Sequence, residues 1–277
     1  MNEENPEKAY WNEEGGARWV ANIERVESML SELSDHLVAR AAARPGEHVL
    51  DIGCGGGVTS AALADGVGET GNVVGADISE VILEVARDRY RGRSNLTFTT
   101  ADAGTHPFPE GSFDLITSRF GVMFFPQPEQ AFANIRKAGK RGGRIVFMCW
   151  RPIAENPWMG AAVAAAFTVL PRPEKPDLDA PGPFSLSQPE KIERILAGAG
   201  FDDISISPVD EDANLGALDL ALDFLTKMGP AAEPLKEASA SDRSAAIAAM
   251  RGAMEPYDTD NGVVMGTATW LVEASIK

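Results

Sequence analysis

The feature that most constrains this chain is the run Val49-Leu50-Asp51-Ile52, which leads into four glycines within residues 53–57. A short apolar run of this kind predicts a buried parallel strand, here over residues 48–52. Glycine has no Cβ, so the segment that follows can turn sharply and let a ligand lie against its backbone. Residues 58–64 then return to a helical pattern. A strand, a glycine turn and a helix in this order form the first half of a nucleotide-type site at the carboxyl edge of an α/β sheet.

The spacing of the glycines narrows the choice of ligand. A dinucleotide fingerprint, G-x-G-x-x-G, counted from Gly53 would need a third glycine at the position of Val58. The chain has D-x-G-x-G-x-G instead, beginning at Asp51. This pattern resembles the first motif of class I methyltransferases that depend on S-adenosylmethionine (SAM). The resemblance implies that Asp51, Gly53, Cys54 and Gly55 contact SAM, whose product is S-adenosylhomocysteine.

The second predicted strand covers residues 72–77 and ends in a carboxylate, Asp77. An acid about 20 residues after a glycine turn is the usual partner of a ribose diol, because a carboxylate accepts hydrogen bonds from both hydroxyls. Asp77 lies 20 residues after Gly57. Alternatively, Asp77 only precedes a helix that Ser79 caps. The apolar strand before it favours the ribose role, and the resemblance adds Ile78 to the cofactor contacts.

Three further strands are predicted at residues 96–100, 113–118 and 144–150. The resemblance implies that Asp102, after the third strand, accepts from the adenine amino group and that the N–H of Ala103 meets the ring. The alternative for Asp102 is a solvated loop aspartate. Ser118 ends the fourth strand, near the methionyl part of SAM. All these residues fall at strand carboxyl ends, which meet at one edge of a parallel sheet.

The resemblance covers about residues 45–150 and is greatest to the branch related to the ubiquinone/menaquinone-biosynthesis methyltransferases, which act on small molecules. It implies an α/β, Rossmann-like doubly wound sheet of strand order 3-2-1-4-5-7-6 with an antiparallel last strand. The alternation of strands with helical patterns supports a parallel sheet covered on both faces. These helices are expected at residues 58–64, 79–90 and 130–138.

We expect one methyltransferase domain over residues 1–277. Apolar residues at helical spacing predict one helix over 18–42, and by resemblance the N-terminal region folds over the cofactor as a lid in which Trp19 contacts SAM. Alternatively, its tryptophans only anchor the helix to the core. The parts of the domain are a lid at 1–44, the cofactor core at 45–150, helical cap insertions at 151–186 and 212–261, and the rest of the core at 187–211 and 262–277.

The second half of the chain breaks the strand–helix alternation. We expect an alanine-rich helix at 158–170, then a proline-rich passage that includes Pro173 and Pro176. A capping box at 187–190 predicts a helix up to residue 199. A strand at 204–209, two or three helices within 217–255, and either a strand pair or one long strand at 263–276 complete the list of expected elements.

Composition limits the partners. The net charge of −16 repels phosphate backbones and anionic membranes, so nucleic acid is not an expected partner. The longest apolar run, 159–170, is too short to span a membrane. Two cysteines, an acidic N-terminus without a signal pattern, and three histidines without ligand spacing predict a cytoplasmic protein with no metal. The expected partner is a small-molecule acceptor, and a homodimer is compatible with the sequence.

Arg119 follows Ser118 directly, where the methionyl part of SAM should meet the acceptor. It either holds an acceptor carboxylate through a bidentate contact or pairs with an acid such as Asp51 and only shapes the site; both readings stay open. Apolar side chains after it and in the expected cap predict a flat or hydrophobic acceptor, although taken singly each is more simply a core residue. They are Phe120, Met123, Trp150, Trp158 and Phe224.

Methyl transfer is an in-line displacement that needs the acceptor close, aligned and dry. Positioning alone can supply about 7–11 kcal/mol, so the lack of an obvious base does not argue against it. The first alternative is a non-catalytic SAM-binding regulatory module, because fold does not fix function. The second is a nicotinamide-dependent oxidoreductase, against which Val58 and the lack of a Tyr-x-x-x-Lys pair both argue. Cyclisation or decarboxylation with SAM cannot be separated from methylation by sequence.

Overall fold

The computed structural model describes residues 6–172, 177 and 179–277. The chain folds into two compact units. The first holds residues up to 150 together with 179–208 and 270–277, and the second holds 151–178 and 209–269. The expected cap insertions therefore fall mainly in the second unit, but the segment from 179 to 186 belongs to the first.

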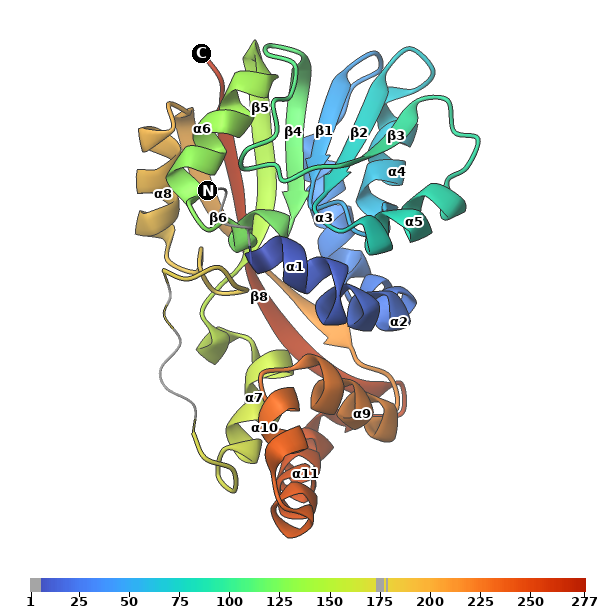
Figure 1. Ribbon diagram of the computed structural model, residues 1–277, viewed down its shortest axis with the longest axis vertical. Helices are drawn as coiled ribbons and strands as arrows, with labels where there is room; N and C mark the ends of the chain where they lie inside the picture. Colours follow the sequence, from blue (N-terminus) through green and yellow to red (C-terminus); the bar gives the residue numbers. More distant parts are fainter. Residues whose placement is uncertain (1–5, 173–176, 178) are drawn as a thin grey trace. The chain divides into compact units, whose positions relative to one another are not determined.

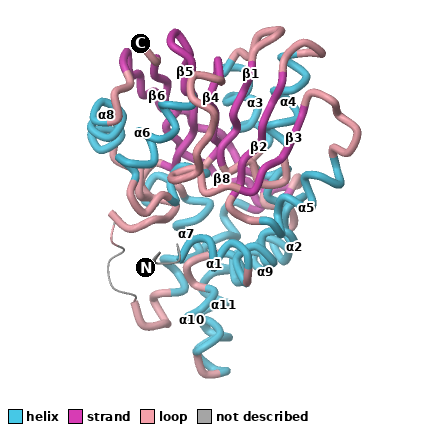
Figure 2. Tube along the Cα trace, turned by 45° about the horizontal axis from the view of Figure 1, so that its top comes forward, coloured by secondary structure: helices cyan, strands magenta, loops and turns pink. Residues whose placement is uncertain are grey.

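The sheet has the strand order β3-β2-β1-β4-β5-β8-β6, and the short β7 pairs with β8 (Figure 1). Strands β1 to β5 pair in parallel, and they lie side by side in Figure 2. β8 runs antiparallel to β5, since Gly142 donates to the carbonyl of Ile276 while Ile276 donates to that of Gly143. With β7 left out, this order confirms the predicted 3-2-1-4-5-7-6. The strands are β1 (His48–Ile52), β2 (Asn72–Asp77), β3 (Leu96–Thr100), β4 (Phe113–Arg119), β5 (Gly139–Trp150), β6 (Asp202–Asn214), β7 (Asp258–Thr259) and β8 (Gly262–Ser275).

Helices cover both faces of the parallel strands. α3 (Ser31–Ala41) and α4 (Val58–Val67) contact each other, as do α6 (Pro128–Ala138) and α8 (Pro189–Gly198). In Figure 1, α6 lies in front of the sheet and α3 and α4 lie behind it. α5 (Glu80–Arg89) follows β2, and the Ser79 hydroxyl accepts from the N–H of Ile82 as its N-cap. The three helices predicted between the strands are therefore present, with ends that differ by a few residues.

The prediction of one helix over residues 18–42 is wrong. The chain forms α1 (Pro6–Asn12), α2 (Glu14–Met29) and α3, with a break at Leu30. Leu30 leaves the helical conformation at φ −103° and ψ 16°, and its side chain is buried. The apolar spacing continues through the break because both helices bury one face, so periodicity alone cannot reveal a bend between them.

Two other local expectations are also corrected. The capping box at 187–190 does not form: Gln188 is the N-cap without a side-chain hydrogen bond, and Pro189 begins the helix. Proline suits this first position because its fixed φ is already helical and it needs no N–H partner there. The strand expected at 144–150 begins five residues earlier, at Gly139, and includes Gly142, which takes a positive φ of 83°.

The second unit is mainly helical. α7 (Pro157–Ala166) packs on α11 (Ala240–Met254), and α9 (Leu218–Met228) and α10 (Ala232–Glu237) contact α11 and each other. Three helices within 217–255 agree with expectation, whereas the helix expected at 158–170 ends four residues early, at 166. Of the expected proline-rich passage, Pro173 and Pro176 lie outside the described residues.

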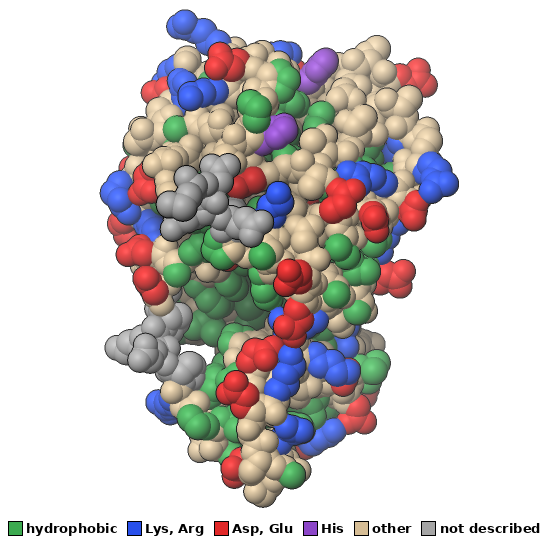
Figure 3. Space-filling view, viewed as in Figure 1, with side chains coloured by type: hydrophobic (Ala, Val, Ile, Leu, Met, Phe, Trp, Pro, Cys, Tyr) green, Lys and Arg blue, Asp and Glu red, His purple; other side chains and the backbone are tan. Residues whose placement is uncertain are grey.

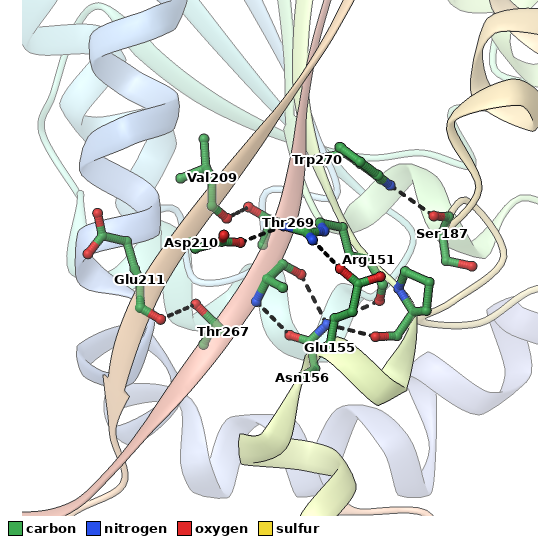
Figure 4. Close-up of polar contacts among 12 residues, drawn as sticks. Arg151, Glu155, Asn156, Ser187, Val209, Asp210, Glu211, Thr267, Thr269 and Trp270 are labelled. Carbon is green, nitrogen blue, oxygen red and sulfur yellow. Dashed lines mark hydrogen bonds and ion pairs between the residues drawn. The ribbon is translucent and has the colours of Figure 1, made fainter.

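A buried polar network fixes the start of the second unit (Figure 4). The fully buried Asn156 donates to the carbonyls of Arg151 and Ala268 and accepts from the N–H of Ala268. Arg151 makes ion pairs with Glu155 and with Asp210. These contacts tie the segment before α7 to β8, because each buried polar atom there needs a partner.

The distribution of charged and apolar side chains is relevant to the expectations about nucleic acid, membranes and metal ions. On the face in Figure 3, Lys and Arg side chains are interspersed with Asp and Glu. Across the described ranges, none of the helices is both long enough and apolar enough to cross a bilayer. Within the same ranges, no group of three or more His, Cys, Asp or Glu side chains is arranged to hold a metal ion.

Candidate cofactor site

The turn between β1 and α4 has the backbone that its glycines predict. Gly53, Gly55 and Gly57 take positive φ values of 63°, 55° and 82°. A Cβ on Gly53 would lie 2.6 Å from the Cα of Gly121, so the turn after β1 touches the turn after β4. A Cβ on Gly55 would meet only the indole nitrogen of Trp19, at 3.8 Å. The backbone at Gly55 therefore faces open space that a ligand can fill.

The Asp51 side chain holds the glycine turn in place through three hydrogen bonds. Its carboxylate accepts hydrogen bonds from the hydroxyls of Thr59 (2.9 Å), Ser60 (2.6 Å) and Thr117 (3.0 Å). All four residues are buried. Burial raises the pKa of Asp51, and the three hydroxyls oppose that shift. The side chain thus joins β1 to α4 and β4; its predicted contact with the cofactor stays a prediction.

Asp77 ends β2 beside the same turn. One carboxylate oxygen accepts from the N–H of Gly55 and the other from the N–H of Ser79, both at 2.9 Å. Burial raises the pKa of Asp77, while these two N–H groups favour its charged form. Each carboxylate oxygen has two lone pairs, so further donors such as ribose hydroxyls can still be accepted.

Asp102 and Ala103 follow β3 at the same edge. The Asp102 side chain accepts from the N–H of Gly104 at 2.9 Å, and its carbonyl accepts from the N–H groups of Thr105 and His106. Ala103 is buried, and its carbonyl accepts from Asn134 of α6. These hydrogen bonds hold Asp102 and Ala103 in a tight turn. The adenine contacts that the resemblance implies for them stay a prediction.

The turn after β4 is strained and aromatic. The buried Ser118 hydroxyl donates to the carbonyl of Ile52 at 2.7 Å and accepts from the N–H of Gly121, so it holds the two turns together. Phe120 takes a positive φ of 66°, which is rare for a bulky residue and often marks a functional site. Its ring stacks on Trp150, with 4.1 Å between centroids and 4° between planes.

These turns border a small cavity of about 40 Å³. Six residues predicted for cofactor or acceptor line it: Trp19, Gly53, Cys54, Gly55, Arg119 and Phe120. Four more were not singled out as site residues from the sequence: Glu27, Leu30, Gly56 and Thr59. Of these, Glu27 lies on α2 and Leu30 lies at the break after it. In the sequence they can be recognised only as a charged and an apolar residue at helical spacing.

Four predicted acceptor residues are not among the residues that line this cavity. One of them, Trp150, is the stacking partner of the Phe120 ring. Met123 is buried in the short 3₁₀ helix Gly121–Phe124, where its sulfur accepts from the N–H of Trp150 at 3.5 Å. Trp158 on α7 and Phe224 on α9 are buried within the second unit. Their contact with an acceptor stays a prediction.

The N-terminal segment packs on the residues that follow Asp77. Asn12 donates to the carbonyl of Ile78 at 3.0 Å and accepts from the N–H of Glu80 at 2.9 Å. The Ser79 hydroxyl donates to the carbonyl of Trp11 at 2.6 Å. The Trp11 ring makes edge-to-face contacts with Trp19 and Phe124. α1 is therefore held against residues 78–80, directly after Asp77.

Comparison with known proteins agrees with this geometry. Residues 50–147 match a family described as a methyltransferase domain. A ubiquinone/menaquinone biosynthesis C-methyltransferase UbiE from Cupriavidus taiwanensis is 36% identical over 141 residues, and its namesake from Ralstonia pickettii is 37% identical over the same length. Each alignment covers 46% of this chain and 58% of the relative, so the chain spans less than two thirds of the relatives' length.

Solved structures share the fold. The YcgJ protein from Bacillus subtilis has a TM-score of 0.57 at 17% identity, covering 88% of this chain and 98% of that one. Phosphoethanolamine N-methyltransferase 2 from Haemonchus contortus, solved in complex with SAM, has a TM-score of 0.60 at 17% identity, covering 98% and 60%. At these identities the likeness supports the Rossmann-like architecture only.

The site fits the cofactor of this family. The space facing Gly55 would be filled by a Cβ, and the Asp77 carboxylate keeps acceptor capacity at the end of β2. SAM is the cofactor that the glycine motif and the matching family share. Residues 50–147 of this chain therefore match the methyltransferase-domain family, and about half of the chain is similar to the ubiquinone/menaquinone biosynthesis C-methyltransferases.

Proposed function

We propose that this chain transfers a methyl group from SAM to a small, apolar or aromatic acceptor. The observation that carries the proposal is the position of Asp77, which binds the Gly55 N–H at the end of β2, where this family holds the ribose. The cavity beside that turn extends to Arg119 and Phe120 at the end of β4. A cofactor held at Asp77 and along the glycine turn would therefore direct its methyl-bearing end toward Phe120.

The acceptor side is apolar and ordered. When bound, SAM supplies a methyl on a sulfonium; the new bond to the acceptor forms as the carbon–sulfur bond breaks, and its electron pair returns to sulfur. Phe120 and Trp150 present a stacked aromatic wall, and Met123 packs behind it. Such walls suit flat or apolar ligands with few polar anchors. Holding the acceptor close and dry supplies about 7–11 kcal/mol without a catalytic base.

We also propose that the N-terminal segment is a lid over the cofactor. α1 has no buried residue, so it contributes little to the core, yet it contacts the loop after Asp77 through Asn12 and Trp11. Excluding water at this position strengthens polar contacts inside the site. Closure over the bound cofactor is the role that these contacts fit.

Deleting residues 1–17 is therefore expected to lower kcat by about tenfold or more, whereas the midpoint of thermal unfolding should fall by only a few degrees. Steady-state turnover and thermal unfolding of the two proteins would be compared. The variant Asn12→Ala removes the contacts to Ile78 and Glu80 alone and should show a smaller fall in kcat. A deletion that unfolds the protein would show that the segment is structural and would contradict the lid.

The two alternatives have less support. A nicotinamide site would need a glycine where Val58 begins α4. A regulatory module would bind SAM without turnover, and nothing in the arrangement of the described residues favours it over catalysis. The cytoplasmic location, the homodimer and the absence of a nucleic-acid partner all stay expectations.

Turnover with methyl-deuterated SAM in a small-molecule extract tests the proposal. Mass spectrometry is expected to find a new metabolite that carries the label, which also identifies the acceptor. SAM binding without any labelled product, in extracts and in panels of aromatic compounds, would favour the regulatory module. Failure to bind SAM in calorimetry would contradict the proposed function as a whole.

A further inference from the structure

Arg119 is surrounded by acids inside the cofactor cavity. It ends β4, and its guanidinium donates to the Ser34 hydroxyl of α3. Burial lowers the pKa of Arg119, and the neighbouring charges of Asp51 and Glu27 oppose that shift. It lines the same cavity as Gly53 and Gly55. The cation therefore lies beside the glycine turn, on the cofactor side of Phe120.

Glu27 brings a second charge to the same cavity from α2. Both of its carboxylate oxygens accept from the Arg89 guanidinium, at 2.8 and 2.7 Å. Its side chain is only 15% exposed. The pair joins α2 to α5 next to Gly56, where a Cβ would lie 2.4 Å from a Glu27 oxygen. Arg89 thus fixes the Glu27 carboxylate at the rim of the turn.

The charges around the cavity leave no excess of positive charge. Arg119 and Arg89 carry two positive charges, whereas Asp51, Glu27 and Asp77 carry three negative ones, so the set has a formal charge of −1. An acceptor carboxylate bound to Arg119 would add an uncompensated negative charge in a buried place, which is costly. An amino-acid zwitterion adds no net charge and offers each cavity charge an opposite partner.

We propose that Arg119 and Glu27 form an amino-acid subsite for the methionyl end of SAM, in which Arg119 binds the α-carboxylate and Glu27 the α-ammonium. This assignment rests on the proposed function and gives Arg119 a third role, as a cofactor residue, beside the two readings left open by the sequence. Among the described residues that line the cavity, Arg119 is the one Lys or Arg. With that cation engaged by the cofactor, no Lys or Arg among the described lining residues is left to bind an acceptor carboxylate.

Calorimetric titration with three ligands would distinguish the Arg119 contact to the carboxylate from the Glu27 contact to the ammonium. SAM carries the carboxylate and the ammonium, decarboxylated SAM carries only the ammonium, and 5′-methylthioadenosine carries neither. Arg119→Met should weaken SAM by about 10–150-fold, the value of a hydrogen bond to a charged group, and leave the other two ligands unchanged. Glu27→Gln should weaken SAM and decarboxylated SAM by similar factors and leave 5′-methylthioadenosine unchanged.

Arg40→Met is the matched control, because Arg40 is an exposed α3 residue that pairs with Glu273 away from the cavity. It should leave all three affinities unchanged. Equal loss of all three ligands in Arg119→Met would overturn the assignment, as would unchanged SAM affinity with a raised acceptor KM. If Arg119→Met does not fold, Glu27→Gln and Arg119→Lys give the same comparison. Failure of the unaltered protein to bind SAM would instead contradict the proposed function.

Discussion

Replacing Asp77 with alanine is expected to weaken SAM binding by about 3 kcal/mol, or on the order of 100-fold in Kd. The substitution removes the carboxylate proposed to accept from both ribose hydroxyls. It also leaves the N–H groups of Gly55 and Ser79 without their acceptor, which loosens the glycine turn. Calorimetric titration of SAM into both proteins measures the loss. Unchanged affinity would show that the ribose lies elsewhere.

Two further variants show whether the loss of SAM affinity comes from the ribose contact or from a general effect of removing a carboxylate. Asp77→Asn keeps one acceptor oxygen and should lose less affinity than Asp77→Ala. Asp88→Ala changes a carboxylate near the end of α5 that is 72% exposed, and it should have no effect.

The pH dependence of binding follows from the pKa of Asp77, which burial raises. Protonation turns one carboxylate oxygen into a donor, so SAM affinity should fall as the pH drops, beginning above the usual range of an aspartate. For stability the sign is opposite: a pKa raised in the folded chain means that the contribution of Asp77 is lost as the pH rises through that value. Both trends should disappear in Asp77→Asn.

Replacing Asp51 with alanine is expected to lower the free energy of unfolding by about 3–5 kcal/mol, because three buried hydroxyls lose their common acceptor. For a domain of this size that corresponds to a fall of about 10 °C in Tm. Thermal unfolding followed by circular dichroism measures it. The hydroxyls that lose their acceptor belong to Thr59, Ser60 and Thr117, whose hydrogen bonds to Asp51 join the turn to α4 and β4.

Asp65→Ala is the control for this prediction. Asp65 is 70% exposed and pairs with Arg93 at the surface, so its loss should change Tm by less than about 2 °C. A similarly small change in Asp51→Ala would mean that the hydroxyls find other partners, and the proposed role of Asp51 in fixing the turn would be wrong.

The parallel part of the fold could be predicted because its signals are local. β1 and β2 are short, mainly apolar runs, and Asp51 and Asp77 lie near their carboxyl ends, where the register aligns them at one edge. The break at Leu30 could not be predicted, since the apolar spacing of α2 continues into α3. Glu27 was also missed, because only the folding of α2 onto α5 brings it to the glycine turn. Contacts between distant segments leave no periodic signal in the sequence.

The backbone contact between Gly53 and Gly121 has a thermodynamic consequence. It joins the turn proposed to hold the cofactor to the turn that carries Phe120, with no space between the two for even a methyl group. A ligand that shifts one turn must therefore displace the other. Occupancy of the two positions is then linked, and linkage is reciprocal: the factor by which SAM changes acceptor affinity equals the factor by which the acceptor changes SAM affinity.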